Sequence, residues 1–179
     1  MTNTAESLAW NLITELRKEL VESQKIRTQI IGFKIAFVSS VIGLVAAHLD
    51  KVPAYLLVLA PFAAVFFDLL ITSYSFSIKR IGYYIRSYIE PQLKHQTSWP
   101  SSSPLWEEFM ANPINKQHMS FWGNFDITVI STAVGIAGLL MTPDSQLATE
   151  LKFGLVIILL IFIAVALTKG RQQFVFDKP

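Results

Sequence analysis

The feature that most constrains this chain is a set of four apolar runs, each close to the length of a membrane-spanning helix. They cover residues 30–47, 54–72, 125–141 and 151–168. A helix takes roughly 20 residues to cross a hydrocarbon core of about 30 Å. A soluble protein of 179 residues would have too little polar surface to cover four such runs. We therefore expect an all-α, polytopic membrane protein with four transmembrane helices in two hairpins and helical cytoplasmic extensions.

Positive charge is distributed unevenly between the segments that flank these runs. Of the 15 Lys and Arg residues, only Lys51 and Lys152 lie in or directly beside the two short loops inside the hairpins. Because positively charged segments stay in the cytoplasm, this bias predicts cytoplasmic N- and C-termini and a cytoplasmic central segment. The expected localisation is the bacterial inner (plasma) membrane, with the chain crossing it several times. No cleavable signal sequence is recognisable at the N-terminus, so the first span is expected to serve as an anchor.

This topology divides the chain into five segments. They are a cytoplasmic amphipathic helix (1–29), the first transmembrane hairpin (30–74), a cytoplasmic helix and loop (75–121), the second transmembrane hairpin (122–169) and a cytoplasmic tail (170–179). No Pro or Gly occurs before Gly32, so the first helix is expected to run unbroken into the first span.

The second span is also expected to continue as a helix past the membrane. In the stretch SYSFSIKRIGYYIRSYIEP, one face carries Ile78, Ile81, Ile85 and Tyr88, while Lys79, Arg80 and Arg86 lie off that face. Pro91 is expected to end the helix. Two interpretations are open, since this helix either projects into the cytoplasm or lies flat on anionic lipid.

Lys34 lies inside the first apolar run and needs a partner. In an antiparallel hairpin that turns at Lys51, residues equally distant from the turn face each other, and Asp68 is as far from Lys51 as Lys34 is. The same register brings Glu22 to Arg80 and Glu15 to Arg86. A lysine at the bilayer centre costs about 2.5–3.5 kcal/mol, and pairing lowers that cost. We predict a Lys34–Asp68 ion pair near the cytoplasmic boundary, either as a structural staple or as part of an ion or proton relay.

The second hairpin is expected to add further polar groups at a similar depth. Its turn near Gln146 places Asp126 within one helical turn of Lys169. The predicted intramembrane polar layer comprises Lys34, Asp68, Asn124, Asp126 and Lys169. If the layer lines a conducting path, Thr128, Ser131 and Thr132 of the third run would join it.

Small residues recur at helical spacing in the first and third apolar runs and allow helices to approach closely. They are Gly32, Ala36 and Ser40 with Ser39, Gly43 and Ala47 in the first run, and Ser131, Gly135 and Gly138 in the third. Two roles are open for them, a seam between copies of the chain or packing within one subunit. We expect a homo-oligomer.

The central segment is expected to contain a loop, because Pro and Ser are frequent from Pro91 onward. Candidate docking residues for a cytoplasmic protein partner are Trp99, Trp106, Phe109, Arg80 and Arg86. For the three aromatic residues, a belt at the membrane interface is the alternative role.

The sequence offers little to catalysis or cofactor binding. Cysteine is absent, and no nucleophile elbow, phosphate loop, dinucleotide fingerprint or zinc-protease motif occurs. His95 and His118 have no carboxylate at ligand spacing. Basic residues are dispersed among acidic ones, which is atypical of nucleic-acid binding. We expect a protein that is not an enzyme and has no catalytic residue, cofactor or metal.

The run SYSFSIKRIGYYIRSYIEP, followed by PLWEEF and a second hairpin, resembles a class of small four-span bacterial inner-membrane proteins. The architecture also resembles that of membrane subunits of antiphage systems such as Kiwa. We expect a non-enzymatic membrane subunit that oligomerises and presents cytoplasmic helices to a soluble partner, as a sensor or membrane-perturbing effector in antiphage defence. The alternative is a small oligomeric ion channel or transporter.

Overall fold

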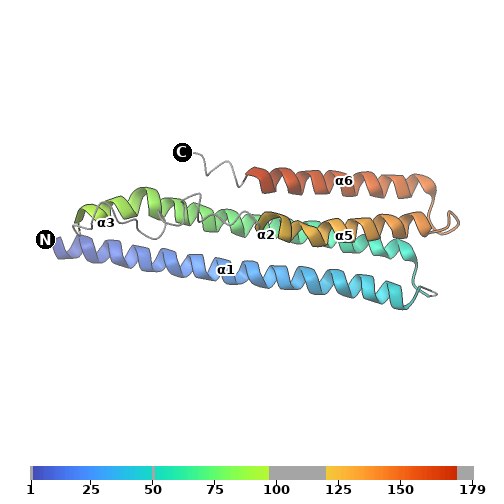
Figure 1. Ribbon diagram of the computed structural model, residues 1–179, viewed down its shortest axis with the longest axis horizontal. Coiled ribbons are helices and arrows are strands. Elements are labelled where there is room, and N and C mark those ends of the chain that lie inside the picture. The colour runs from blue at the N-terminus through green and yellow to red at the C-terminus, as the bar shows by residue number, and fades with distance from the viewer. Residues whose placement is uncertain (1, 50, 97–119, 173–179) are drawn as a thin grey trace. The chain divides into compact units, whose positions relative to one another are not determined.

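The computed structural model describes the backbone of residues 2–49, 51–96 and 120–172, and every regular element in these ranges is a helix. The elements are α1 (Thr2–Ala47), the 3-10 helix η1 (Ala54–Val58), α2 (Leu59–Tyr84), the π-helix η2 (Ile85–Ile89), α3 (Glu90–Gln96), α5 (Ser120–Met141) and α6 (Thr149–Gln172) (Figure 1). The predicted all-α class is therefore confirmed for the described residues.

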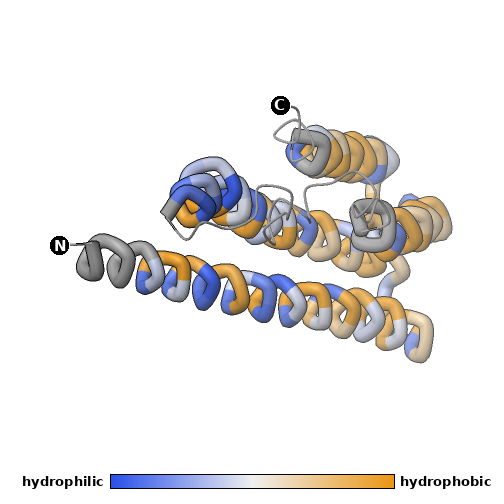
Figure 2. The backbone as a smooth tube through the Cα atoms, turned by 60° about the vertical axis from the view of Figure 1, so that its left-hand side comes forward, coloured by the Kyte–Doolittle hydropathy of each residue, from blue (hydrophilic) through white to orange (hydrophobic). Residues whose placement is uncertain are grey.

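Three helical stretches are long and apolar enough to cross a membrane. They are Trp10–Ala47, Ala54–His95 and Thr149–Lys169, and the described part of α5 adds a shorter apolar helix, Phe125–Met141. The colouring of Figure 2 shows that α6 is hydrophobic along most of its length. An apolar surface on all sides is typical of a helix surrounded by lipid or by other apolar helices.

The chain divides into two units, and α1 and α2 contribute to both. Unit 1 is drawn from residues 1–26 and 74–118, and unit 2 from residues 27–73 and 119–179. Helix α1 continues without a break from Thr2 to Ala47, as the absence of early Pro and Gly predicts.

The core of unit 1 is an apolar cluster between α1 and the stretch that runs from the end of α2 through η2 to α3. It contains Ile13, Ile81, Ile85, Ile89 and Leu93, with Leu16 and Leu20 packed against it. From Ile81 onward these residues recur every four positions, a spacing that drifts around an α-helix of 3.6 residues per turn. The wider π turn of η2, closed by a hydrogen bond from Glu90 N–H to Ile85 O, offsets this drift and keeps all four on one side.

The π turn corrects the predicted apolar face of this segment. An uninterrupted α-helix would place Tyr88 beside Ile85 on the inner face. In the structure Ile89 takes that inner position with 6% of its surface exposed, and Tyr88 is 57% exposed. The periodicity of a regular helix was therefore the wrong template for residues 85–89.

Pro91 does not end the helix, which is a second correction. Residues Glu90–Gln96 continue as α3 directly after the π turn. A proline ring inside an α-helix clashes with the carbonyl four residues earlier, here that of Ser87. Since η2 widens the helix at Ser87, and Pro91 is only the second residue of α3, the chain passes Pro91 without leaving the helical path.

In unit 2, α1 and α2 run antiparallel after the turn that follows Ala47. Backbone hydrogen bonds from Lys51 and Val52 to the carbonyl of His48 close this turn, and Pro53 precedes η1. Val38 of α1 then packs against Ala60 and Ala64 of α2. The small alanines allow the two helices to come close.

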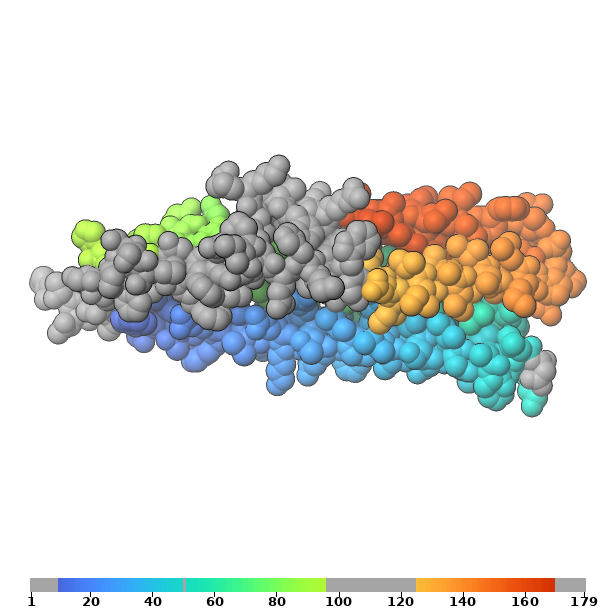
Figure 3. Space-filling model, viewed as in Figure 1, coloured from blue at the N-terminus to red at the C-terminus, as the bar shows by residue number. Residues whose placement is uncertain are grey.

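Helices α5 and α6 complete unit 2, and they lie side by side in Figure 3. Ile127 of α5 packs on the cluster formed by α1 and α2. A second cluster joins Val65 of α2, Phe125 of α5 and Ala166 of α6. Helix α5 therefore contacts both α2 and α6.

Two glycines of α5 allow the closest approach in unit 2. A Cβ atom added to Gly138 would lie 2.6 Å from the carbonyl oxygen of Ala54, and one added to Gly135 would lie 2.8 Å from Cγ of Pro61. By contrast, a Cβ added to Gly43 of α1 would meet no atom within 4 Å. Of the two roles open for the small residues, those of α5 serve packing within the subunit.

We predict that Gly138→Ala lowers the free energy of unfolding by about 1–3 kcal/mol, because the methyl group would press on backbone that cannot move aside. Gly154→Ala of α6 is the matched control, because a Cβ atom there would meet no atom within 4 Å, and it should leave stability unchanged or slightly raised, since alanine favours helix. Chemical unfolding in mixed micelles, followed by circular dichroism, measures both. Equal losses in the two variants would contradict this packing.

Candidate functional site

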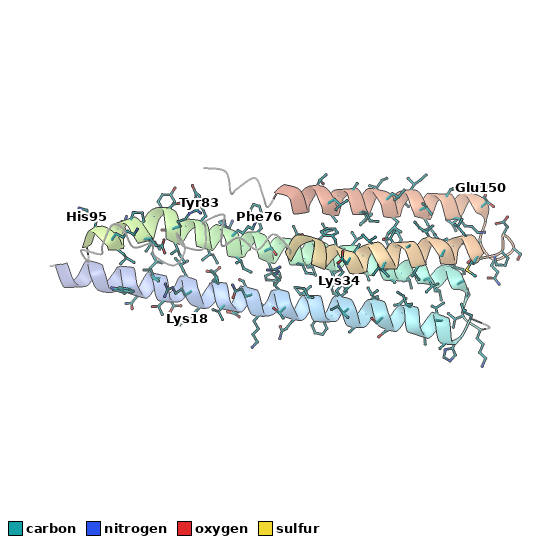
Figure 4. The ribbon with its side chains drawn as sticks, viewed as in Figure 1. Lys18, Lys34, Phe76, Tyr83, His95 and Glu150 are labelled. Carbon is teal, nitrogen blue, oxygen red and sulfur yellow. The ribbon has the colours of Figure 1, made fainter. Side chains whose placement is uncertain are left out.

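The most unusual feature of unit 2 is an ion pair with no exposure to solvent. Lys34 Nζ of α1 donates a hydrogen bond to Asp68 Oδ1 of α2 at 2.6 Å, and each side chain is only 1% exposed. Figure 4 shows Lys34 directed from α1 into the space between the helices. The predicted contact between Lys34 and Asp68 is confirmed, while its depth in a membrane stays a prediction.

A third helix completes the pair. Thr128 Oγ1 of α5 donates to Asp68 Oδ2 at 2.5 Å, and Thr128 is 1% exposed. Each carboxylate oxygen of Asp68 therefore accepts a hydrogen bond from a different helix. We refer to Lys34, Asp68 and Thr128 as the buried triad.

The backbone carbonyl of Thr128 also accepts hydrogen bonds from side chains of α5. Ser131 Oγ and Thr132 Oγ1 both donate to the carbonyl oxygen of Thr128, at 3.0 and 2.6 Å. Such bonds to a preceding carbonyl satisfy hydroxyl groups within their own helix. Both hydroxyls are therefore oriented toward α5 itself, and Thr128 is the residue of the three that reaches another helix.

Local sequence explains why Lys34 meets Asp68 and why Thr128 lies on the buried face of α5. Lys34 and Asp68 lie at equal distances from the turn at Lys51, so the hairpin register alone brings them together. Phe125 and Thr128 are both buried, and their separation of three residues places them on one face of α5. Asp126, which is two residues from Thr128, falls outside that face.

Asp126 and Lys169 of the predicted polar layer do not join the buried triad. Asp126 and Lys169 are both exposed, and the side chain of Asn124 lies outside the described residues. The sequence places Thr128 only in a possible conducting path, so its contact with Asp68 is not predicted. Nothing in the sequence specified the register of α5 against α2, because a long segment connects them.

Of the predicted charge pairs of unit 1, Glu15 and Arg86 have other partners in the structure, and no ion pair joins Glu22 to Arg80, both of which are described and exposed. Glu15 accepts a hydrogen bond from Lys18 of its own helix at 2.8 Å. The guanidinium carbon of Arg86 lies 5.6 Å from the centre of the Tyr83 ring. Local partners are sufficient because an ion pair between exposed side chains contributes little free energy of stabilisation.

Among the candidate docking residues, Arg80 is exposed and Arg86 is half-buried. Trp99, Trp106 and Phe109 lie outside the described residues. Lys152 in the first turn of α6 makes a further ion pair with the stretch that precedes it, because its Nζ donates to Asp144 Oδ1 at 2.7 Å and to Thr142 O at 2.5 Å. The hydrogen bond from Lys152 lowers the pKa of the Asp144 carboxyl below its ordinary value.

The buried triad has little capacity to bind a further group, because its hydrogen bonds are already formed within the triad. Asp68 has no oxygen without a donor, and Lys34 is engaged with Asp68. Across the described ranges, no group of three or more His, Asp or Glu side chains is arranged to hold a metal ion. The arrangement is suited to holding three helices together, or to exchanging a proton or cation if the pair separates.

Comparison with known proteins gives no relative from which a role could be transferred. No family model, no curated protein and no solved structure matches the chain. Functional inference therefore depends on the geometry of the chain itself.

We predict that Lys34→Leu alone lowers the free energy of unfolding by about 3–5 kcal/mol, because it leaves the Asp68 carboxylate buried without its ammonium partner. The double variant Lys34→Leu/Asp68→Leu should recover most of this loss, since no uncompensated charge is left. Unfolding in mixed micelles measures both variants.

The matched control is Lys18→Leu, which breaks the exposed pair with Glu15 and should cost less than about 1 kcal/mol. If the double variant at Lys34 and Asp68 lost as much stability as the sum of the two single variants, the two charges would be energetically independent, against the observed contact.

Proposed function

We propose that this chain is a non-enzymatic integral subunit of the bacterial inner membrane that presents cytoplasmic helices to a soluble partner. In this proposal it crosses the membrane four times in two hairpins, with both termini and residues 75–121 in the cytoplasm. The observation that carries it is helix length. The stretches Trp10–Ala47 and Ala54–His95 contain 38 and 42 residues, about twice the roughly 20 residues that one crossing requires.

The surfaces of the two units support this division between lipid and water. In unit 2 large apolar side chains are exposed on several helices, among them Phe33, Phe37, Ile130, Phe153, Ile157 and Ile161. Unit 1 instead buries its isoleucines in one cluster and exposes charged residues such as Arg17, Lys18 and Glu19 on α1. An exposed apolar surface suits lipid, and a buried cluster with a charged exterior suits water.

Homo-oligomerisation is part of the proposal and is supported by α1. A Cβ atom added to Gly32 or Gly43 would meet no neighbouring atom within 4 Å, unlike one added to the glycines of α5. Glycines on an open helix face allow a second helix to approach closely. The resemblance to membrane subunits of antiphage systems makes sensing or perturbing the membrane in antiphage defence the setting we propose.

The absence of cysteine allows the topology to be tested directly. We predict that a membrane-impermeant maleimide labels Ser145→Cys in intact spheroplasts, and labels Ser87→Cys only after the membrane is opened. Both serines are exposed in the structure. Ile158→Cys is the control, because it is 45% exposed but should resist labelling from either side if lipid covers it. Labelling of Ser145→Cys and Ser87→Cys from one compartment would refute the proposal.

The buried triad favours a second candidate function, an oligomeric ion channel or transporter. Ionisable side chains within membrane spans often belong to ion or proton pathways, and Lys34 and Asp68 lie among three helices. In that case proteoliposomes should show ion or proton flux that is lost in Asp68→Asn and kept in Asp126→Asn, a control at an exposed carboxylate of α5. Flux no greater than that of empty liposomes would exclude this candidate.

A further inference from the structure

Tyrosine and arginine side chains of unit 1 lie around the part of the helix surface that the buried isoleucines leave open. We call Arg80, Tyr83, Tyr84, Arg86 and Tyr88 the tyrosine–arginine face. The three tyrosines are 48%, 43% and 57% exposed in chain order. Figure 4 shows Tyr83 directed away from α1. These exposed rings have no role in the core of the unit.

The side chains of this face are already ordered against one another. The rings of Tyr84 and Tyr88 lie 5.3 Å apart between centres and are tilted by 31°. The guanidinium carbon of Arg86 lies 5.6 Å from the centre of the Tyr83 ring. Side chains that are held before binding lose less conformational entropy when a partner arrives. Tyrosine and arginine are also the residues enriched where binding energy concentrates in protein interfaces.

The charge of this part of the chain indicates the chemistry of the partner. Residues 79–96 contain four basic side chains, Lys79, Arg80, Arg86 and Lys94, while their one carboxylate, Glu90, is 6% exposed. The described α1 portion of unit 1 is balanced, because its Arg and Lys residues are matched by Glu residues. Arg80 and Arg86 are therefore the charged groups that the face presents, and a complementary surface must be negative.

Two other occupants fit this charge less well. A second copy that paired through the same face would bring arginines against arginines, which costs free energy. Helix α2 is continuous to Tyr84, and the apolar run ends near Thr72. At 1.5 Å per residue, Tyr83 and Tyr84 lie roughly 17 Å beyond that end along the helix, whereas the headgroup layer is only about 5–8 Å deep.

We infer that the tyrosine–arginine face binds an acidic segment of a soluble protein, with Arg80 and Arg86 pairing with its carboxylates and the tyrosines covering its apolar side chains. This inference depends on the proposed function in one respect, because residues 75–121 must face the cytoplasm. It adds the binding face and the charge of the partner.

The test uses the photo-cross-linker p-benzoylphenylalanine in place of Tyr84 in the full-length chain, produced in the organism that encodes it. Irradiation should give an adduct with another protein, and mass spectrometry should place the link in a segment rich in Asp and Glu. The yield should fall about tenfold in Arg80→Glu/Arg86→Glu, because charge reversal turns attraction into repulsion. It should also fall when isolated membranes are irradiated at high salt.

Two matched controls keep the test specific. Cross-linker at Val21, which is 61% exposed on α1, should give little of the same adduct. Arg17→Glu, a charge reversal at an exposed position of α1, should leave the yield from position 84 unchanged. Circular dichroism of Arg80→Glu/Arg86→Glu should match that of the unchanged chain, which shows that the variant folds.

Several outcomes would overturn the inference. One is that no adduct forms. Another is that the adduct forms only with lipid, with a second copy or with residues 97–119 of the same chain. A third is a cross-linking yield that does not change when the two arginines are replaced. Labelling of Ser87→Cys separates this failure from failure of the proposed function. If Ser87 is cytoplasmic and the cross-link fails, only the inference about the tyrosine–arginine face is lost.

Discussion

Unit 2 depends on how the cost of burying Lys34 and Asp68 among apolar helices is offset. An ammonium group and a carboxylate each lose several kcal/mol of hydration when buried, and their attraction repays this only when the remaining hydrogen-bonding capacity is also used. The structure meets that condition, because Asp68 accepts from Lys34 on one oxygen and from Thr128 on the other. Three helices are thereby tied to one carboxylate, and the glycines of α5 allow the backbone approach around Ala54 and Pro61 that tightens the same helix against η1 and α2.

The two units expose different kinds of surface. In unit 1 a narrow stripe of isoleucines is buried and the opposite side is polar or aromatic, whereas unit 2 exposes apolar side chains on several helices. Since α1 runs without interruption from Thr2 to Ala47, this change takes place within a single helix rather than at a linker. Such continuity suits our proposal of a membrane subunit that offers the tyrosine–arginine face to a soluble partner.

The sequence predicted the contacts that follow from short connections and regular periods. Lys34 met Asp68 because a tight turn at Lys51 determines which residues of α1 and α2 face each other. It did not predict Thr128 as the second donor, because a long segment separates α2 from α5 and leaves their register open. Tyr88 was misplaced for a different reason, since the π turn at Ile85–Ile89 changes the period where Ser87 must avoid the ring of Pro91. Local sequence rules thus predicted the register of the first hairpin. They did not predict the π turn at Ile85–Ile89 or the contact between Thr128 and Asp68, which are distant in sequence.

The order in which the triad is completed has a consequence for synthesis of the chain. Asp68 and Thr128 are 60 residues apart, so the ribosome finishes α2 well before α5 exists. Until α5 arrives, Oδ2 of Asp68 must find its hydrogen bond elsewhere, in water or on another molecule. The nascent chain therefore gains its final set of donors only when α5 docks beside α2.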